Sequence, residues 1–187
     1  MSARFPATAT LCARRPRLPR RTFAQSEVLP VPLPIALRVW LARQGFPGLC
    51  SRDSGGDTPL MRAAGLGEET MLAMLLAYAA APEAHNDEGN TALWFACQHG
   101  APGAIARLLH AGCAVDHAND ADMTCLMQAA QSGRLDIMQL LLAYGANPRL
   151  CAPDGRSALD MLAQQGLQLT PLLQLGRSLP APREATP

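Results

Sequence analysis

The sequence contains no lysine, and only 4% of its residues are aromatic. Hydrophobic residues make up 49% of the chain, so a core would be built mainly from alanine and leucine. This composition favours close-packed helices over a β-sandwich, which uses many β-branched and aromatic residues. The 187 residues allow one ordinary domain and a tail.

Long apolar runs are also missing. The longest, Met71 to Pro82, is far shorter than the roughly 20 residues that cross a bilayer. Pro30, Pro32 and Pro34 interrupt the one apolar segment that could serve as a secretory signal. We therefore expect no membrane association and a cytoplasmic location. The alternative is mitochondrial targeting by the arginine-rich N-terminus, although the prolines there disfavour the amphipathic helix that targeting needs.

Motifs for metal binding and catalysis are absent as well. The six cysteines include no C-x-x-C pair, and they form no metal-ligand spacing with the four histidines. We expect reduced, mostly buried thiols rather than a disulfide framework. There is no glycine-rich phosphate loop and no arrangement of serine, histidine and aspartate typical of a hydrolase. The sequence thus predicts no enzyme activity, no cofactor, no metal and no small-molecule substrate.

The charges are present but segregated. Residues 1–26 carry six arginines and no acid, whereas residues 53–125 carry ten acids and two arginines. The whole chain still has a formal net charge of only +1. An asymmetry of this kind informs about binding partners more than about fold.

A 33-residue period organises the middle of the chain. Similar segments read GDTPLMRAAGLG at 56–67, GNTALWFACQHG at 89–100, DMTCLMQAAQSG at 122–133 and GRSALDMLAQQG at 155–166. The four units are in register without an insertion or deletion. A fixed period of this length predicts stacked supersecondary units, each of which buries its apolar side against the next.

Each recurring position has a physical reason. The hydroxyl residues that open the units can cap a short helix, and Pro59 suits the first helical position because its missing N–H costs nothing there. The glycine that closes each segment supplies the left-handed backbone that ends a helix. A second helix then carries a Leu-Leu pair and ends at Gly112 or Gly145. The predicted caps are Thr58, Thr91, Thr124 and Ser157.

This cadence of Gly-x-Thr-Pro-Leu, Ala-Ala, Gly and Leu-Leu resembles the ankyrin repeat. The resemblance implies an all-α fold, an ankyrin-type α-solenoid of stacked helix-turn-helix repeats with β-turn fingers. Two departures affect local geometry. Ala79 stands where glycine would end a second helix, so that helix could continue to Pro82. Asp122 replaces a turn glycine, which aspartate tolerates better than most residues.

The period also divides the chain. We expect an Arg/Pro-rich, disordered N-terminal segment at 1–34 and an N-terminal capping half-repeat at 35–52. Three full repeats follow at 53–85, 86–118 and 119–151. A C-terminal capping repeat at 152–176 and a disordered tail at 177–187 come last.

The resemblance implies a non-catalytic scaffold or adaptor that binds a protein through its turn fingers and concave face. Many of the acids fall in or beside the turns, which favours a basic partner; the alternative is a solvated surface that serves solubility. The contact candidates lie in the turns and at the ends of the first helices. They are Asp57, Asp87, Glu88, Asn90, Gln98, His99, Asp120, Met123, Gln131, Ser132, Asp154 and Arg156.

Two features leave alternatives open. Trp94 and Phe95 would fill the seams between neighbouring units, or one of them would lie exposed as an anchor for a partner. The arginine-rich stretch Arg14 to Arg21 suits a disordered leader, an organelle signal or a nucleic-acid-binding arm, although no aromatic residues interleave with the arginines. We also hypothesise that this basic segment folds back on the acidic turns.

Overall fold

The structure, a computed structural model, describes residues 33–78 and 80–164. These ranges contain eight α-helices and no strand. The helices are α1 (Ile35–Arg43), α2 (Pro59–Leu66), α3 (Glu69–Ala77), α4 (Ala92–His99), α5 (Pro102–His110), α6 (Cys125–Gln131), α7 (Leu135–Ala143) and α8 (Ala158–Gln164).

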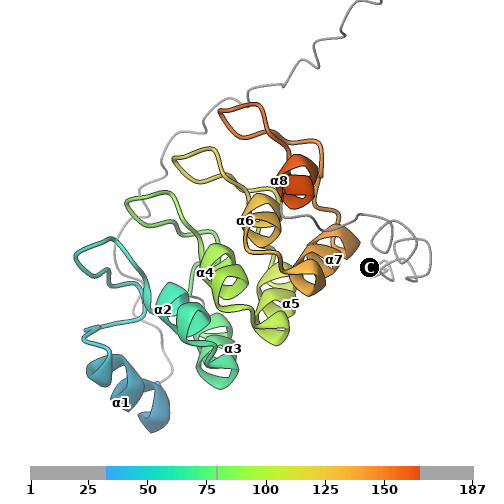
Figure 1. Cartoon of the computed structure of the whole chain (residues 1–187). Helices are drawn as coiled ribbons and strands as arrows, with labels where there is room; N and C mark the ends of the chain where they lie inside the picture. The colour runs from blue at the N-terminus through green and yellow to red at the C-terminus, as the bar shows by residue number, and fades with distance from the viewer. Residues whose placement is uncertain (1–32, 79, 165–187) are drawn as a thin grey trace, which may run out of the picture.

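The helices form two parallel rows (Figure 1). In the first-helix row α2, α4, α6 and α8 pack each against the next, and in the second-helix row α1, α3, α5 and α7 do the same. The loops that enter the first helices all project to the same side. The predicted all-α solenoid of stacked helical hairpins is therefore confirmed.

The first helices begin as the sequence predicts, with one exception. Thr58 Oγ1 accepts a hydrogen bond from Met61 N, and Thr124 Oγ1 accepts one from Met127 N, both at 3.3 Å. At α8, Asp160 N donates to Ser157 Oγ and Ser157 N donates to Asp160 Oδ2, which is the reciprocal arrangement of a capping box. Thr91 is the N-cap residue of α4 and has the extended backbone of a cap, but its side chain makes no capping bond, so the predicted hydroxyl bond is absent at this helix.

The second helices end in a common way. Cys113 N donates to Leu108 O at 3.1 Å, and Ala146 N donates to Leu141 O at 3.0 Å. The same bond runs from Ala80 N to Leu75 O at 3.0 Å, so α3 ends at Ala77. In all three second helices this bond runs from an N–H to the carbonyl five residues earlier, and it ends the helix. The prediction that α3 could continue to Pro82 is therefore wrong. Asp122 adopts the expected left-handed backbone, with φ at 55°.

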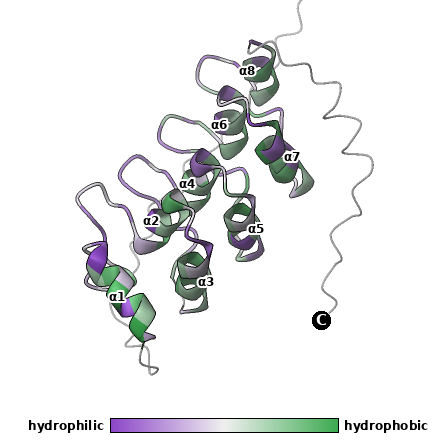
Figure 2. Cartoon of the chain, turned by 60° about the horizontal axis from the view of Figure 1, so that its bottom comes forward, coloured by the Kyte–Doolittle hydropathy of each residue, from purple (hydrophilic) through white to green (hydrophobic). Residues whose placement is uncertain are grey.

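The core lies between the two rows and repeats with the sequence period. Leu75, Leu108 and Leu141 are fully buried in the second helices. Each is the first leucine of its pair, and the second leucine is only half-buried. The first helices bury Leu60, Leu93 and Leu126 in the same way. Figure 2 shows the finger loops as mostly hydrophilic, beside helices that carry the apolar residues. Within the described residues no helix has the length and apolarity that a membrane crossing requires.

Three of the cysteines in the described residues are part of this core. Cys97 and Cys125 are buried free thiols, and burial raises the pKa of the buried Cys113 thiol to about 12. Cys50 is a free thiol at the surface. The prediction of reduced thiols is confirmed for these four and that of burial for three of them, whereas Cys151 is disulfide-bonded, so the prediction of a reduced thiol is wrong at that position.

Candidate functional site

Four fingers project from the first-helix row, and in the first three a side chain bonds to the backbone of its own finger in the same way. In the first, Asp53 Oδ1 accepts hydrogen bonds from the backbone N–H groups two and four residues later, both at 2.9 Å. Asn86 Oδ1 and Asn119 Oδ1 do the same in the second and third fingers, at distances between 2.9 and 3.1 Å. These side chains shape the turns that the sequence places on the surface. The fingers comprise residues 53–57, 86–90, 119–123 and 152–156.

Successive fingers are also bonded to one another. Asn86 Nδ2 donates to Asp57 Oδ1 at 2.8 Å, and Asn119 Nδ2 donates to Asn90 Oδ1 at 2.9 Å. Backbone bonds run beside them, from Asp87 N to Gly55 O at 3.2 Å and from Asp120 N to Glu88 O at 3.0 Å. The first three fingers thus form a hydrogen-bonded ladder. Sequence reasoning missed Asn86 and Asn119, although they are separated by the 33-residue period.

The ladder does not extend to the fourth finger in this form. The residue that corresponds to Asn119 is Ala152, which has no side-chain amide. The next residue, Pro153, has no N–H to donate where the earlier fingers use Asp87 and Asp120. The fourth finger keeps its own turn bonds, including Gly155 N to Ala152 O at 2.9 Å.

The predicted contact residues differ in their access to solvent. Asn90 is buried, with 5% of its surface exposed, and its side chain holds Glu88 and accepts from Asn119. Asn90 therefore supports the ladder and leaves little of its surface for contact with another molecule. The half-buried candidates are Asp57, Met123 and Arg156. The exposed candidates are Asp87, Glu88, Gln98, His99, Asp120, Gln131, Ser132 and Asp154.

Some acids of the fingers are neutralised by arginine and others are not. Arg62 Nη2 lies 2.7 Å from Asp53 Oδ2, and Arg156 Nη2 lies 2.5 Å from Asp154 Oδ2. Burial raises the pKa of Asp53, but hydrogen bonds from the backbone of Asp57 and Gly55 and from Arg62 outweigh it and hold that pKa below its ordinary value. Within the described part of the chain, Asp87 and Glu88 form no ion pair with an arginine.

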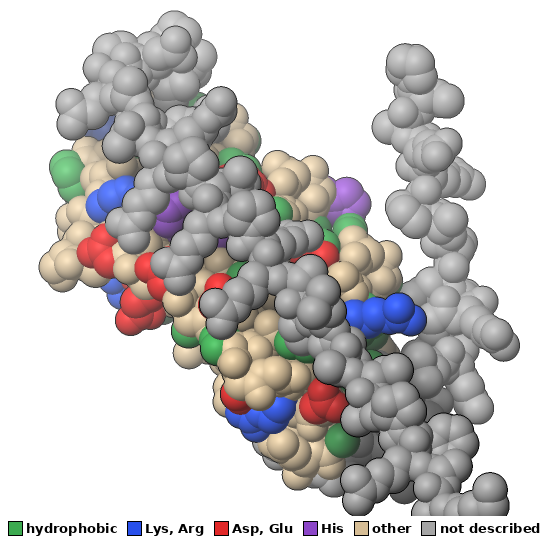
Figure 3. All heavy atoms as spheres, turned by 90° about the horizontal axis from the view of Figure 1, so that it is seen from above, with side chains coloured by type: hydrophobic (Ala, Val, Ile, Leu, Met, Phe, Trp, Pro, Cys, Tyr) green, Lys and Arg blue, Asp and Glu red, His purple; other side chains and the backbone are tan. Residues whose placement is uncertain are grey.

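Acidic side chains are visible at several points of the face seen from above in Figure 3, with arginine and histidine side chains among them. The exposed carboxylates of Asp87 and Glu88 lie on the second finger, next to Asp57 of the first. Arg52 Nη1 lies between the same two fingers, donating to Gly56 O at 2.8 Å and to His85 O at 2.6 Å, so one cation offsets part of the charge of these three carboxylates and a net negative potential remains. That potential favours a cationic group on any molecule that approaches the fingers.

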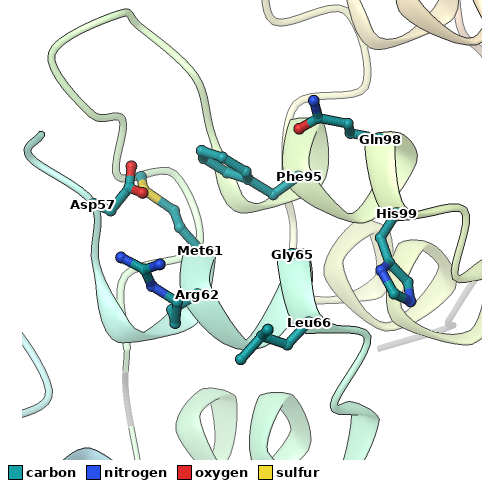
Figure 4. A pocket seen from close by; sticks show the side chains of 8 residues that line it. All are labelled: Asp57, Met61, Arg62, Gly65, Leu66, Phe95, Gln98 and His99. Carbon is teal, nitrogen blue, oxygen red and sulfur yellow. The ribbon is translucent and has the colours of Figure 1, made fainter. Parts of the chain in front are cut away.

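A groove lies between α2 and α4 beside the first two fingers. It has a volume of about 240 Å³ and is lined by Asp57, Met61, Arg62, Gly65, Leu66, Phe95, Gln98 and His99. Figure 4 shows Phe95 reaching from α4 toward α2, with Met61 and Arg62 across from it. Leu66 is 46% exposed, which is unusual for so large an apolar side chain in this structure. The groove therefore combines apolar surface, mainly from Leu66 and Phe95, with the polar side chains of Asp57, Arg62, Gln98 and His99.

The two aromatic residues of α4 combine both readings that the sequence left open. Trp94 and Phe95 are half-buried and pack against the core, and Phe95 lies beside Gly65 of the preceding unit. Phe95 also lines the groove and is accessible there. Sequence reasoning did not identify the groove itself.

The described residues contain no group of three or more histidine, cysteine or acidic side chains that could hold a metal ion. The His85 and His117 rings stack with their centroids 6.3 Å apart, and His117 Nε2 lies 2.8 Å from Gly89 O. These two histidines therefore pack against each other beside the second and third fingers. The arginine-rich stretch 14–21 lies outside the described residues, as do residues 165–176 of the expected C-terminal capping repeat, the expected tail 177–187, and the expected N-terminal segment except Leu33 and Pro34.

Comparisons with known proteins agree with this architecture. Residues 40–119 match a family model described as ankyrin repeats (3 copies), and residues 108–162 match a second one described as ankyrin repeats (many copies). Together the two matches span residues 40–162. No curated protein matches the chain.

Proposed function

The chain belongs to the ankyrin repeat family, whose repeats are generally protein–protein interaction modules, and we propose that it binds a basic protein partner through its fingers and first-helix row. The family is typically non-catalytic. The groove of about 240 Å³ is also smaller than the roughly 300–1,000 Å³ of most small-molecule sites. A protein surface is therefore the ligand that suits these residues best.

The observation that carries the proposal is the state of the second-finger acids. Asp87 and Glu88 are exposed, and neither pairs with an arginine in the described residues. Both sit on a finger whose turn is fixed by Asn86 and bonded to the fingers on either side. Because the ladder already orders these loops, little conformational entropy remains to be lost on binding. Fixed, unneutralised carboxylates would attract and orient a basic surface.

Affinity capture with charge variants tests this proposal. The double variant Asp87→Asn, Glu88→Gln removes two charges and keeps the shape of both side chains. We expect it to retain less of a discrete basic protein than the unmodified chain, with a difference that shrinks as salt rises and screens the carboxylates. The matched control is Glu69→Gln, Asp136→Asn, which removes two exposed acids from the second-helix row. Equal retention by the finger variant and the control variant would contradict the proposal.

A further inference from the structure

We propose that the groove between α2 and α4 receives one large apolar side chain of the partner, beside an arginine or lysine of the same segment that pairs with Asp57. This inference rests on the proposed function and narrows it to one position of the first-helix row and one chemical class of partner segment. The segment is one in which an apolar residue and a basic residue lie close together.

The apolar character of the groove supports a side chain as its occupant. Met61 is almost fully buried and lies at the base of the groove, whereas Leu66 leaves 46% of its surface exposed. Phe95 lies across the space between the two helices (Figure 4). Exposed apolar surface of this kind, bordered by polar groups, is typical of sites that bury a residue of another molecule.

Gly65 explains why the groove opens at this seam. Gln98 and Gln131 stand at the corresponding positions of the next two units, 33 and 66 residues later. Gly65 has no side chain, so the space beside Phe95 is not filled by α2. A Cβ atom at position 65 would lie 3.7 Å from Phe95 Cβ and from Phe95 Cδ1, which is ordinary van der Waals contact. A methyl group would therefore fit there and occupy part of the groove.

The charges on the rim select a cation. Arg62 lines the groove, but its guanidinium is paired with Asp53 at 2.7 Å. Asp57 also lines the groove and forms no ion pair with an arginine in the described residues; its Oδ1 accepts only from the neutral amide of Asn86. A carboxylate at the edge of an apolar groove, with Asp87 on the adjoining finger, favours a basic neighbour of the apolar residue.

The substitution Gly65→Ala gives a sharp test, because it fills the groove without disturbing the fold. Alanine is a better helix former than glycine, so the thermal midpoint should stay the same or rise. Gly103→Ala is the matched control: it places the same methyl group in α5 of the second-helix row, where it meets only the flexible carboxylate end of Glu69. The probes are short Gly-Ser peptides that contain Leu-Gly-Arg, Ser-Gly-Arg or Leu-Gly-Ser, titrated into the full-length chain and followed by NMR.

We expect the Leu-Gly-Arg peptide to shift the amide signals of Gly65, Leu66 and Gln98. The other two peptides should bind at least about fivefold more weakly, because each lacks one of the two anchors. Gly65→Ala should weaken binding of Leu-Gly-Arg by about tenfold, as overfilling a packed site does, and Gly103→Ala should leave it unchanged. With Asp57→Asn, the chain should lose its preference for Leu-Gly-Arg over Leu-Gly-Ser.

Other results overturn the inference in recognisable ways. If Gly65→Ala leaves peptide binding unchanged, or if none of the three peptides shifts the groove signals, the groove is not the docking position. If Gly65→Ala lowers self-association of the chain, a second copy occupies the groove instead. In each case the capture experiment with the finger variant gives an independent result. A negative result for the groove can therefore be distinguished from a negative result for the proposed function.

Discussion

Asn86 of the second finger donates a hydrogen bond to Asp57 of the first, with 2.8 Å between Nδ2 and Oδ1. The same Asn86 side chain accepts from Glu88 N and Asn90 N within its own finger. One side chain thus shapes a turn and joins it to the preceding unit. Asn119 repeats both roles one period later.

The first prediction concerns this ladder. Asn86→Ala should lower the free energy of unfolding by about 2 kcal/mol, because Asn86 is buried and its removal leaves two backbone N–H groups and Asp57 without their partner. Urea unfolding followed by far-UV circular dichroism measures the loss. Asn147→Ala serves as the control, because Asn147 is exposed and its side chain accepts one turn bond, from Arg149 N, without joining two fingers; it should cost about 1 kcal/mol or less. Equal losses for the two variants would show that the ladder adds no stability.

The second prediction follows from the end of the ladder at Pro153. Gly89 N of the second finger and Gly155 N of the fourth donate equivalent bonds within their fingers, at 3.0 and 2.9 Å. Of these two fingers, only the second has asparagine side-chain bonds to its neighbours, through Asn86 and Asn90. We expect the Gly155 amide to exchange with solvent at least about tenfold faster than the Gly89 amide, because a less constrained loop opens more often. Native-state hydrogen exchange by NMR measures both rates in one sample. Equal protection would mean that the cross-finger bonds do not limit opening.

The third prediction concerns the interface between units. Leu108 is fully buried in α5, so Leu108→Asp places a charge in the core and should destabilise the protein by about 4 kcal/mol or more. Because each unit is stabilised by its neighbours, most of the helical circular dichroism signal should be lost rather than the share of one repeat. Val39→Asp is the comparison, since Val39 is 47% exposed, and it should keep full helicity. Retained helicity in Leu108→Asp would contradict the stacked core.

The fourth prediction is a pH dependence. The pKa of Asp53 is lower in the folded protein than the ordinary value of about 4, so its stabilising effect is complete above that value and is lost as pH falls through the folded pKa. Asp53→Asn keeps the acceptor of the turn, as Asn86 does in the next finger, and removes the titrating group. The fall in stability below about pH 4 should therefore be shallower in Asp53→Asn, as read from urea midpoints. An unchanged slope would show that Asp53 does not contribute to acid denaturation.

The fold could be predicted from the sequence because a fixed period reveals which residues share a role. Leu60, Leu93 and Leu126 are equivalent in the sequence and equivalent in the core. Capping was less predictable, since Thr91 has the same position as Thr58 but lacks its bond. The position of a hydroxyl can be read from the period, whereas the period does not fix the rotamer that its side chain adopts.

The candidate site was only partly predictable, for a related reason. Exposed acids such as Asp87 and Glu88 follow from their place in polar turns. Asn90 also lies in a turn, but its side chain is buried and accepts a hydrogen bond from Asn119 of the next finger. The period alone does not show which side of a turn a side chain faces. The groove lies where Gly65 occupies the position that glutamine holds in the next two units, at Gln98 and Gln131. Comparison of equivalent positions in the repeats could therefore have indicated a gap at this seam.

The central claim is that the fingers and the first-helix row, rather than the second-helix row, form the binding face. Hydrogen–deuterium exchange mass spectrometry of the full-length chain with its captured partner tests this claim most directly. We predict new protection in peptides that cover residues 53–66, 86–99 and 119–131, and unchanged exchange in α3, α5 and α7. Protection confined to those three helices, with the fingers unchanged, would contradict the account.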